Sequence, residues 1–311
     1  MPGDPVTGGD RQPGSDRRPD SRAVLASARY GKSEVRLLHV RRDDGRHEIS
    51  DLNVSTSLAG DFAATYLNGD NAGVLTTDAQ KNAVYALARR HGPLPAEEFG
   101  GRLGRHFTSV PSVDRATARI EQYGWRRIDA AGAPHPHSFE RQSGTRIASV
   151  IVHADGRSEA VAGAGELVLL KSTGSEFRGF LRDEYTTLAP AGDRILATVA
   201  DARWRFEGPP PDWDASFAAA AAALREAFAV SYSRSLQQTL YSMAEAVLAA
   251  CPRACEVRLS LPNRHHFLAD LSPFGLDNPG TVFHVADRHY GLIEGTVLRP
   301  GAPPGDPDHA W

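Results

Sequence analysis

Apolar and polar residues alternate with a period of two along several segments of the chain, which is the pattern of half-buried β-strands. The first two segments cover residues 32–40 and 52–58, and a turn sequence, Asp-Asp-Gly, lies between them at 43–45. This pattern predicts a long antiparallel hairpin. A similar pattern predicts a second pair of strands over residues 116–128 and 134–141.

Between these two strand pairs the apolar positions change to helical spacing. Residues 79–91 carry an apolar stripe and end before Gly92-Pro93, so they predict a helix with Thr77 or Asp78 as its N-cap. Residues 96–107 place Phe and Leu side chains on one side and predict a second helix. The first half of the chain therefore has the predicted order strand, strand, helix, helix, strand, strand.

The second half repeats this order with one additional strand. Its expected elements are strands over 147–152, 165–171 and 195–206, helices over 214–228 and 236–250, and strands over 259–269 and 281–297. The repeat predicts two α+β domains, 23–143 and 144–300. The Pro- and Gly-rich ends, 1–22 and 301–311, are expected to be a disordered N-terminal extension and a flexible C-terminal tail.

Composition limits the classes of partner. The 311 residues are 41% hydrophobic and 23% charged, as in an ordinary globular protein long enough for two domains. A net charge of −3 gives no electrostatic reason to expect nucleic acid or a membrane as partner, so an anionic substrate would need local positive groups. Two cysteines, Cys251 and Cys255, together with the lack of a bilayer-length apolar run or a hydrophobic signal core, predict a cytoplasmic protein.

The stretch from Lys171 to Arg194 follows an apolar strand and is polar, aromatic and irregular, like many loops that carry sites. The Phe177 ring offers a flat face to a heterocycle, and the Arg194 guanidinium offers two parallel donors to an anion. Together they suit a planar anionic ligand. In the alternative interpretation Phe177 is a core aromatic and Arg194 pairs with Asp193 or Glu184 at the surface.

Asn263 and His265 share one face of the predicted strand 259–269, among apolar neighbours. A histidine in such a position is more often a satisfied core residue than a catalyst. On spacing alone, Lys32 is typical of a surface lysine and Thr77 of a helix cap.

The order of these residues along the chain adds a resemblance. The motifs are Tyr30-Gly31-Lys32, Thr77-Asp78, Pro134 to Phe139, the run Lys171-Ser172-Thr173 with Ser175, Phe177, Phe180, Tyr185, Leu188 and Arg194, and Leu261 to Phe267. In these motifs the chain resembles the urate oxidase (uricase) family over residues 30–299. The resemblance implies two tandem T-fold (tunnelling fold) domains, each an antiparallel β-sheet with helices packed on one face. It also implies oxidation of urate by O2 and water to 5-hydroxyisourate and hydrogen peroxide, with no metal and no organic cofactor.

The resemblance further implies which residues bind the substrate. They are Thr77, Asp78, Phe177, Arg194, Leu236, Gln237 and Asn263. Phe177 stacks on the purine, and Arg194 and Gln237 clamp it by hydrogen bonds, with Gln238 in place of Gln237 if the register shifts by one residue. Asn263 faces O2 or water above the ring.

Catalysis is implied to use Lys32, Thr77 and His265 as a proton relay. A lysine in a site of low dielectric is able to act as a base near neutral pH. The family implies a homotetramer with active sites at subunit interfaces, where Lys32 and Thr77 of one chain face the substrate-binding loop of another.

Two other functions stay open on the sequence. His135 and His137 share one face of a strand, and with Cys251 and Cys255 they are candidate ligands of a zinc-dependent heterocycle hydrolase on the same fold. A non-catalytic purine-binding protein would need only the aromatic ring and the arginine of the loop. The presence of a full set of proton-moving residues speaks against that second alternative.

Overall fold

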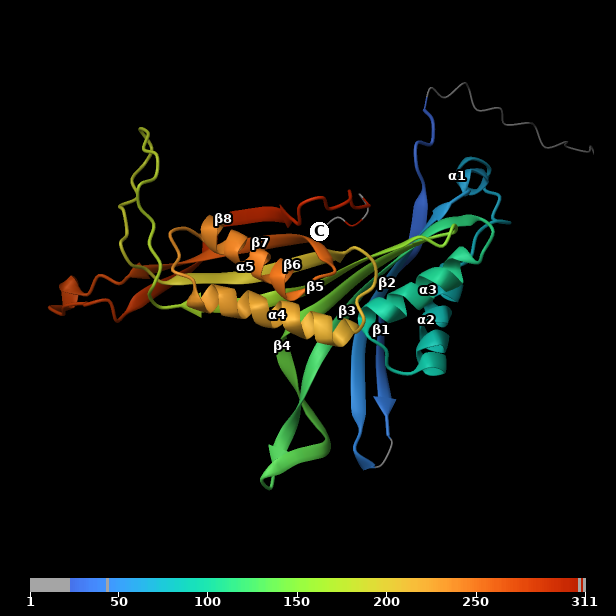
Figure 1. The fold of residues 1–311 in the computed structure, drawn as a ribbon, viewed down its shortest axis with the longest axis horizontal. Helices are drawn as coiled ribbons and strands as arrows, with labels where there is room; N and C mark the ends of the chain where they lie inside the picture. Colours follow the sequence, from blue (N-terminus) through green and yellow to red (C-terminus); the bar gives the residue numbers. More distant parts are fainter. Residues whose placement is uncertain (1–22, 43–44, 307–308, 310–311) are drawn as a thin grey trace, which may run out of the picture.

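The computed structural model describes residues 23–42, 45–306 and 309, and the expected extension over 1–22 lies outside them. Its eight strands form one sheet in which every neighbouring pair is antiparallel (Figure 1). The strands are β1 (Arg29–Arg41), β2 (Glu48–Gly60), β3 (Val113–Ala130), β4 (Ala133–His153), β5 (Ser158–Lys171), β6 (Leu196–Phe206), β7 (Ala254–Leu268) and β8 (Phe283–Leu298). The helices are α1 (Ala63–Asn68), α2 (Thr77–His91), α3 (Ala96–Thr108), α4 (Trp213–Val230), α5 (Leu236–Ala250) and the short η2 (Ser272–Phe274).

All four long helices cover the same face of the sheet. Ile120, Ala148, Ala162 and Trp204 follow one another in register across β3 to β6, and each is at most 1% exposed. Helices α2 and α3 pack over the first four strands and α4 and α5 over the last four, which gives two hydrophobic cores side by side. The predicted α+β fold with helices on one face is confirmed.

Two of the expected strands are one continuous strand. The strands expected at 134–141 and 147–152 are the single 21-residue strand β4, and its last part, Thr145 to Val152, also pairs with β5. The pattern changes at Gly144, where a φ of +84° alters the side-chain alternation without ending the backbone pairing. The boundary expected at 143/144 therefore lies inside β4, and we propose the turn at 154–157 as the division between the two repeats.

Glycines in α3 let that helix approach the sheet closely. A Cβ atom on Gly104 would lie 2.4 Å from Cγ2 of Val152, and one on Gly100 would lie 2.9 Å from Cγ2 of Val150. Either contact is closer than packed carbon atoms tolerate. Glycine inside a helix lowers its stability relative to alanine, and the close packing of α3 on β4 offsets that loss.

The C-terminal segment differs from the expected flexible tail. The guanidinium of Arg205 donates to the carbonyl oxygen of Pro303 at 2.6 Å, and that of Arg258 donates to His309 O at 2.8 Å. The His309 side chain is buried, at 4% exposed. The segment packs on the helix-free face because the arginines there need acceptors, which its carbonyl groups provide.

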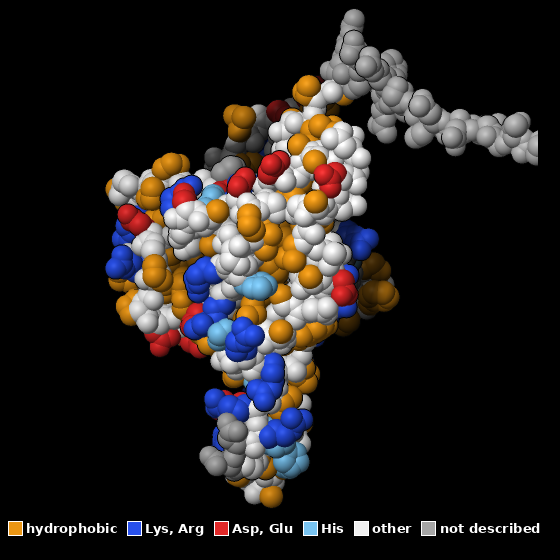
Figure 2. Space-filling view, turned by 90° about the vertical axis from the view of Figure 1, so that its right-hand side faces the viewer, with side chains coloured by type: hydrophobic (Ala, Val, Ile, Leu, Met, Phe, Trp, Pro, Cys, Tyr) orange, Lys and Arg blue, Asp and Glu red, His pale blue; other side chains and the backbone are white. Residues whose placement is uncertain are grey.

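Two hairpins extend past the helices and form a projecting arm, which consists of the ends of β1 and β2 and residues 124–144 of β3 and β4 (Figure 1). The His47 amide donates to Pro136 O at 3.0 Å and ties the two hairpins together. Figure 2 shows Lys, Arg and His side chains gathered along this arm. Among the described helices, none has the length and apolar character to span a membrane.

Candidate active site

The loop between β5 and β6 is held by its own backbone. Phe177 and Ala191 exchange two amide-to-carbonyl hydrogen bonds of 2.9 Å, and the Arg194 amide donates to Ser175 O at 2.8 Å. The Asp193 carboxylate accepts from the Thr173 hydroxyl at 2.6 Å. The loop is irregular in dihedral angles but fixed in position, as a binding site requires.

Phe177 and Arg194 lie together in this loop. The guanidinium carbon of Arg194 lies 5.2 Å from the centroid of the Phe177 ring, and Phe180 stacks on Phe177 with 5.0 Å between centroids. Nε of Arg194 is buried without a hydrogen-bond partner in the described part of the chain. Burial also lowers the pKa of Arg194 below its ordinary value. These two observations are those of an anion site whose charge is not neutralised within the chain.

The alternative of a surface ion pair is not what the structure shows. The Asp193 carboxylate accepts hydrogen bonds from the Thr173 hydroxyl and from the backbone amides of Ser175 and Arg194. No ion pair joins the Arg194 side chain to Asp193 or Glu184 within the described residues.

His265 lies near the same arginine. Burial lowers the pKa of His265, and the charges of Arg194, His289 and His266 add to the effect in that order. The neighbour Asn263 lies opposite Thr198 of β6. Thr198 is fully buried, and its hydroxyl oxygen has no partner among the described residues. His289 and Thr198 were missed from the sequence, because only pairing across strands brings them here.

The start of α5 contributes the glutamine. Ser235 caps the helix, Leu236 is 2% exposed in the core and Gln237 is exposed in the first turn. The side-chain oxygen of Gln238 accepts from the Arg234 amide at 2.9 Å, so it is already engaged. This favours Gln237 over Gln238 as the residue that points to a ligand. The expected contact of Leu236 with substrate stays a prediction.

Buried polar groups connect the loop to α5. The Glu176 amide donates to Ser233 O at 2.7 Å, and the Thr239 hydroxyl donates to the Ser233 hydroxyl oxygen at 2.7 Å. Lys171 donates from Nζ to the carbonyl oxygens of Phe228, at 3.3 Å, and Ser231, at 2.5 Å, at the end of α4. Burial lowers the pKa of this lysine. Ser233 and Thr239 were not identified from the sequence, although the Ser-rich run 231–235 was a signal.

A second group of expected residues lies on the first half of the chain. The cap of α2 is Thr76, whose hydroxyl accepts from the Ala79 amide at 3.0 Å, and not Thr77 or Asp78 as expected. The Thr77 hydroxyl is therefore not consumed by capping. Asp78 bonds to Lys81, which is the largest cause of its lowered pKa, and the charge of Lys32 is a smaller cause, so Lys32 lies near the start of α2.

Lys32 is placed by its own strand. It lies opposite Thr56 in the β1–β2 ladder and is half-buried. A Cβ on the preceding Gly31 would lie 1.8 Å from Thr56 O, so only glycine fits between the two strands there. The Tyr30 hydroxyl donates to Leu75 O at 2.9 Å and ties β1 to the segment before α2.

One chain does not bring these two groups together. Figure 1 shows the loop between β5 and β6 and the start of α2 at opposite ends of the long axis. We call the expected residues Lys32, Thr77 and Asp78 the first half-site, and the expected residues Phe177, Arg194, Gln237, Asn263 and His265 the second half-site. His265 thus lies with the second group of its own chain and away from Lys32.

The ligands of the zinc alternative are also apart. The His135 and His137 rings lie 4.4 Å apart on the projecting arm. Cys251 and Cys255 are buried in the other half of the chain, where their thiols donate to the carbonyl oxygens of Ser216 and Arg205. The described residues contain no group of three or more His, Cys, Asp or Glu side chains that could hold a metal ion.

Comparison with known proteins gives one family. The family model described as Uricase matches residues 28–150 and 160–294. A uricase from Arthrobacter globiformis is 49% identical over 284 residues, which cover 91% of this chain and 92% of that protein. A uricase from Dictyostelium discoideum is 37% identical, over 89% of this chain and 98% of that protein.

Solved structures agree. The crystal structure of the Arthrobacter globiformis uricase superimposes with a TM-score of 0.88 at 48% identity, over 93% of this chain and 99% of that one. The resemblance found in the motifs is therefore confirmed, and the chain belongs to the uricase family.

Proposed function

We propose that the chain is a urate oxidase that acts without a metal or organic cofactor, at sites completed between the chains of a homotetramer. Urate loses two electrons, O2 takes up two electrons and two protons to become hydrogen peroxide, and water supplies the hydroxyl group of 5-hydroxyisourate. Membership of the uricase family supports the reaction. The observation that carries the binding site is the buried, unpartnered Nε of Arg194 beside the Phe177 ring.

In this proposal the second half-site binds urate. Phe177 stacks on the purine, and the guanidinium of Arg194 and the amide of Gln237 hold its polar edges. A desolvated guanidinium attracts an anion more strongly than an exposed one, because the effective dielectric around it is lower. Asn263 faces the position of O2 and then of water.

The first half-site moves protons. Lys32 draws a proton through the Thr77 hydroxyl from urate or water, and Asp78 lies beside them in the first turn of α2. The positive end of the α2 dipole favours the anion so formed. The resulting urate dianion is electron-rich enough to reduce O2 directly.

The separation of the half-sites supports the tetramer. The start of α2 lies at the other end of the chain from the loop between β5 and β6, so a complete set of residues requires a second copy (Figure 1). His265 belongs to the binding chain and completes the relay when the partner's half-site meets it. We also propose a cytoplasmic location, which the two free cysteines support.

The test is urate consumption by purified protein dialysed against a chelator. Loss of the ultraviolet absorbance of urate, O2 uptake and peroxide release should proceed in equal amounts. Activity that disappears on dialysis and returns only with an added metal would contradict the cofactor-free mechanism. An assembled tetramer that binds urate but does not convert it would contradict the proposed enzymatic activity.

A further inference from the structure

A cavity of about 90 Å³ lies on the helix-free face of the sheet, beneath the C-terminal segment. Its lining includes Thr117, Arg119, Ser149, Arg203, Arg258 and His309. A volume of this size exceeds that needed for single waters and suits one tetrahedral oxyanion. None of these residues belongs to either half-site.

The sheet brings the arginines toward one place. Arg119, Ser149, Val161 and Arg205 lie in register across β3 to β6, so two short side chains separate the two arginines of that row. The adjacent row contains Gly163 opposite Arg203.

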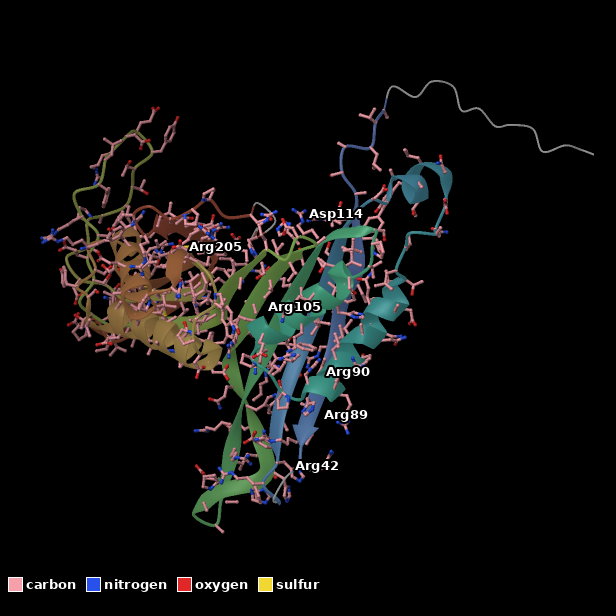
Figure 3. The ribbon with its side chains drawn as sticks, turned by 45° about the vertical axis from the view of Figure 1, so that its right-hand side comes forward. Arg42, Arg89, Arg90, Arg105, Asp114 and Arg205 are labelled. Atoms are coloured by element: carbon pink, nitrogen blue, oxygen red, sulfur yellow. The ribbon has the colours of Figure 1, made fainter. Side chains whose placement is uncertain are left out.

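Gly163 explains how Arg203 reaches the cavity. A Cβ on Gly163 would lie 2.6 Å from Cδ of Arg203, so the arginine side chain lies across the surface of β5 where a larger residue would block it. Figure 3 labels Arg205 on the neighbouring β6 position, where it donates to Pro303 O of the covering segment.

The charges around the cavity are not balanced. Arg205 and Glu256 also line the cavity, and the Glu256 carboxylate pairs with both Arg205 and Arg258. Glu159 lies 3.1 Å from His309 and 3.7 Å from Arg205. Arg119 has no ion pair with any described carboxylate. The nearest ion-pair partner of Arg203 is Asp201, whose oxygen is 3.8 Å away and whose side chain is 45% exposed.

Arg203 therefore carries a poorly compensated charge in a partly buried place. Burial lowers its pKa first, and the like charge of Arg119 lowers it further, against the opposing charges of Asp201 and Glu121. An anion placed between the two arginines would relieve both effects.

We propose that this cavity binds a small inorganic oxyanion of the phosphate or sulfate type between Arg119 and Arg203. Each guanidinium presents paired donors to such an anion, and the hydroxyl groups of Thr117 and Ser149 are further donors. His309 covers the bound anion and limits its exchange with solvent. The site is separate from urate binding and does not depend on the proposed function.

The test is titration calorimetry of the full-length protein with inorganic phosphate at constant ionic strength. We expect one saturable site per chain, with an affinity reduced at least about tenfold by Arg119→Gln and by Arg203→Gln. Arg203→Lys keeps the positive charge but not the paired donors of the guanidinium, so its loss of phosphate affinity should be smaller than that of Arg203→Gln. Arg126→Gln, an exposed arginine of the arm paired with Glu140, is the matched control and should bind like the parent.

The Arg194→Gln variant distinguishes phosphate binding in the cavity from phosphate binding at the urate site. If phosphate binds in the cavity, this variant should have the same phosphate affinity as the parent. Because Arg119 is exposed, its substitution tests the site without unfolding the chain. Absence of saturable binding, or equal affinity of the parent, Arg119→Gln and Arg203→Gln, would overturn the proposal. Loss of binding only in Arg194→Gln would do the same.

Discussion

The guanidinium carbon of Arg194 lies 5.2 Å from the centroid of the Phe177 ring, so a charged planar group and an aromatic ring lie next to each other in the loop. Hydrogen bonds through Ser175 and Ala191 fix both residues from the backbone. The backbone of the pair is therefore preorganised, and little backbone entropy remains to be lost when a ligand binds.

Arg194→Gln should lower kcat/KM for urate by about 10- to 100-fold, because a charge-assisted hydrogen bond to the substrate is lost. Phe177→Leu should lower it by about 2- to 10-fold through lost stacking. Arg178→Gln is the control, since that side chain is 64% exposed and pairs with Glu176. Steady-state kinetics give kcat/KM for urate in each variant, and an Arg194→Gln effect no larger than that of Arg178→Gln would count against the assigned role.

Lys32→Ala and Arg194→Gln chains should each have strongly reduced activity alone and regain part of it when they assemble together. If each site takes one half from each of two chains, random mixing leaves about one quarter of the sites intact. The measurement is the activity of co-expressed chains relative to the parent. Mixed assemblies no more active than the single variants would mean that one chain supplies both halves.

The pKa of His265 should be below 6.5, because burial and then the charge of Arg194 disfavour the imidazolium. At a pH well above the ordinary histidine pKa, the side chain is neutral in the folded and the unfolded chain and contributes nothing to the pH dependence of stability. As the pH falls through that ordinary value, the unfolded chain binds the proton more readily, so the free energy of unfolding decreases. Titration by NMR gives the pKa directly, and Arg194→Gln should raise it. An unchanged pKa in that variant would show that the two side chains do not interact.

Glu97→Ala should lower the free energy of unfolding by about 1–3 kcal/mol, because it removes the buried partner of Arg146 and leaves that charge paired only with the largely exposed Asp214. The two side chains are 0% and 10% exposed, and their ion pair is 2.6 Å long. Glu98→Ala is the neighbouring control: its pair with Arg102 is exposed, and the expected loss is below about 1 kcal/mol. Chemical denaturation of the two variants gives the comparison, and equal losses would refute the role of burial.

Gly104→Ala should destabilise the chain by about 1–3 kcal/mol through overpacking, although alanine favours a helix. The added methyl group meets Val152, and Val152→Ala in the same chain should recover part of the loss. Gly101→Ala adds a methyl group near the flexible Arg105 side chain, at 3.4 Å, and should stabilise the chain by up to about 1 kcal/mol. Thermal denaturation checks both, and a stabilising Gly104→Ala would show that α3 is free to move off β4.

Local patterns predicted most of the fold. The period of two and the helical stripes located the four long helices and most of the strands, and the expected helix over 236–250 is α5 to the residue, but the short α1 and η2 were missed. The continuous β4 was not predictable, because Gly144 interrupts the side-chain alternation while the hydrogen-bonded ladder continues. The cap of α2 was missed by one residue, since Thr76, Thr77 and Asp78 are all good caps and only geometry selects Thr76.

Site prediction depended on motifs and not on spacing. The motifs named Arg194 and His265, but their proximity comes from the packing of β6, β7 and the loop between β5 and β6. Ser233 and Thr239, which hold that loop against α5, were missed, because the Ser-rich run 231–235 does not show which hydroxyl groups are buried. The docked position of His309 was missed for a related reason: its partners, Glu159 and Arg258, are remote in the chain.

The open sheet has a consequence for the lone chain. Within the described residues β1 pairs only with β2 and β8 only with β7, so strands of 13 and 16 residues each leave one edge of backbone donors and acceptors uncovered. Edges of that length recruit other strands and promote aggregation. Association of copies along these edges would cover them, and a variant that folds but cannot assemble should aggregate at concentrations at which the parent stays in solution.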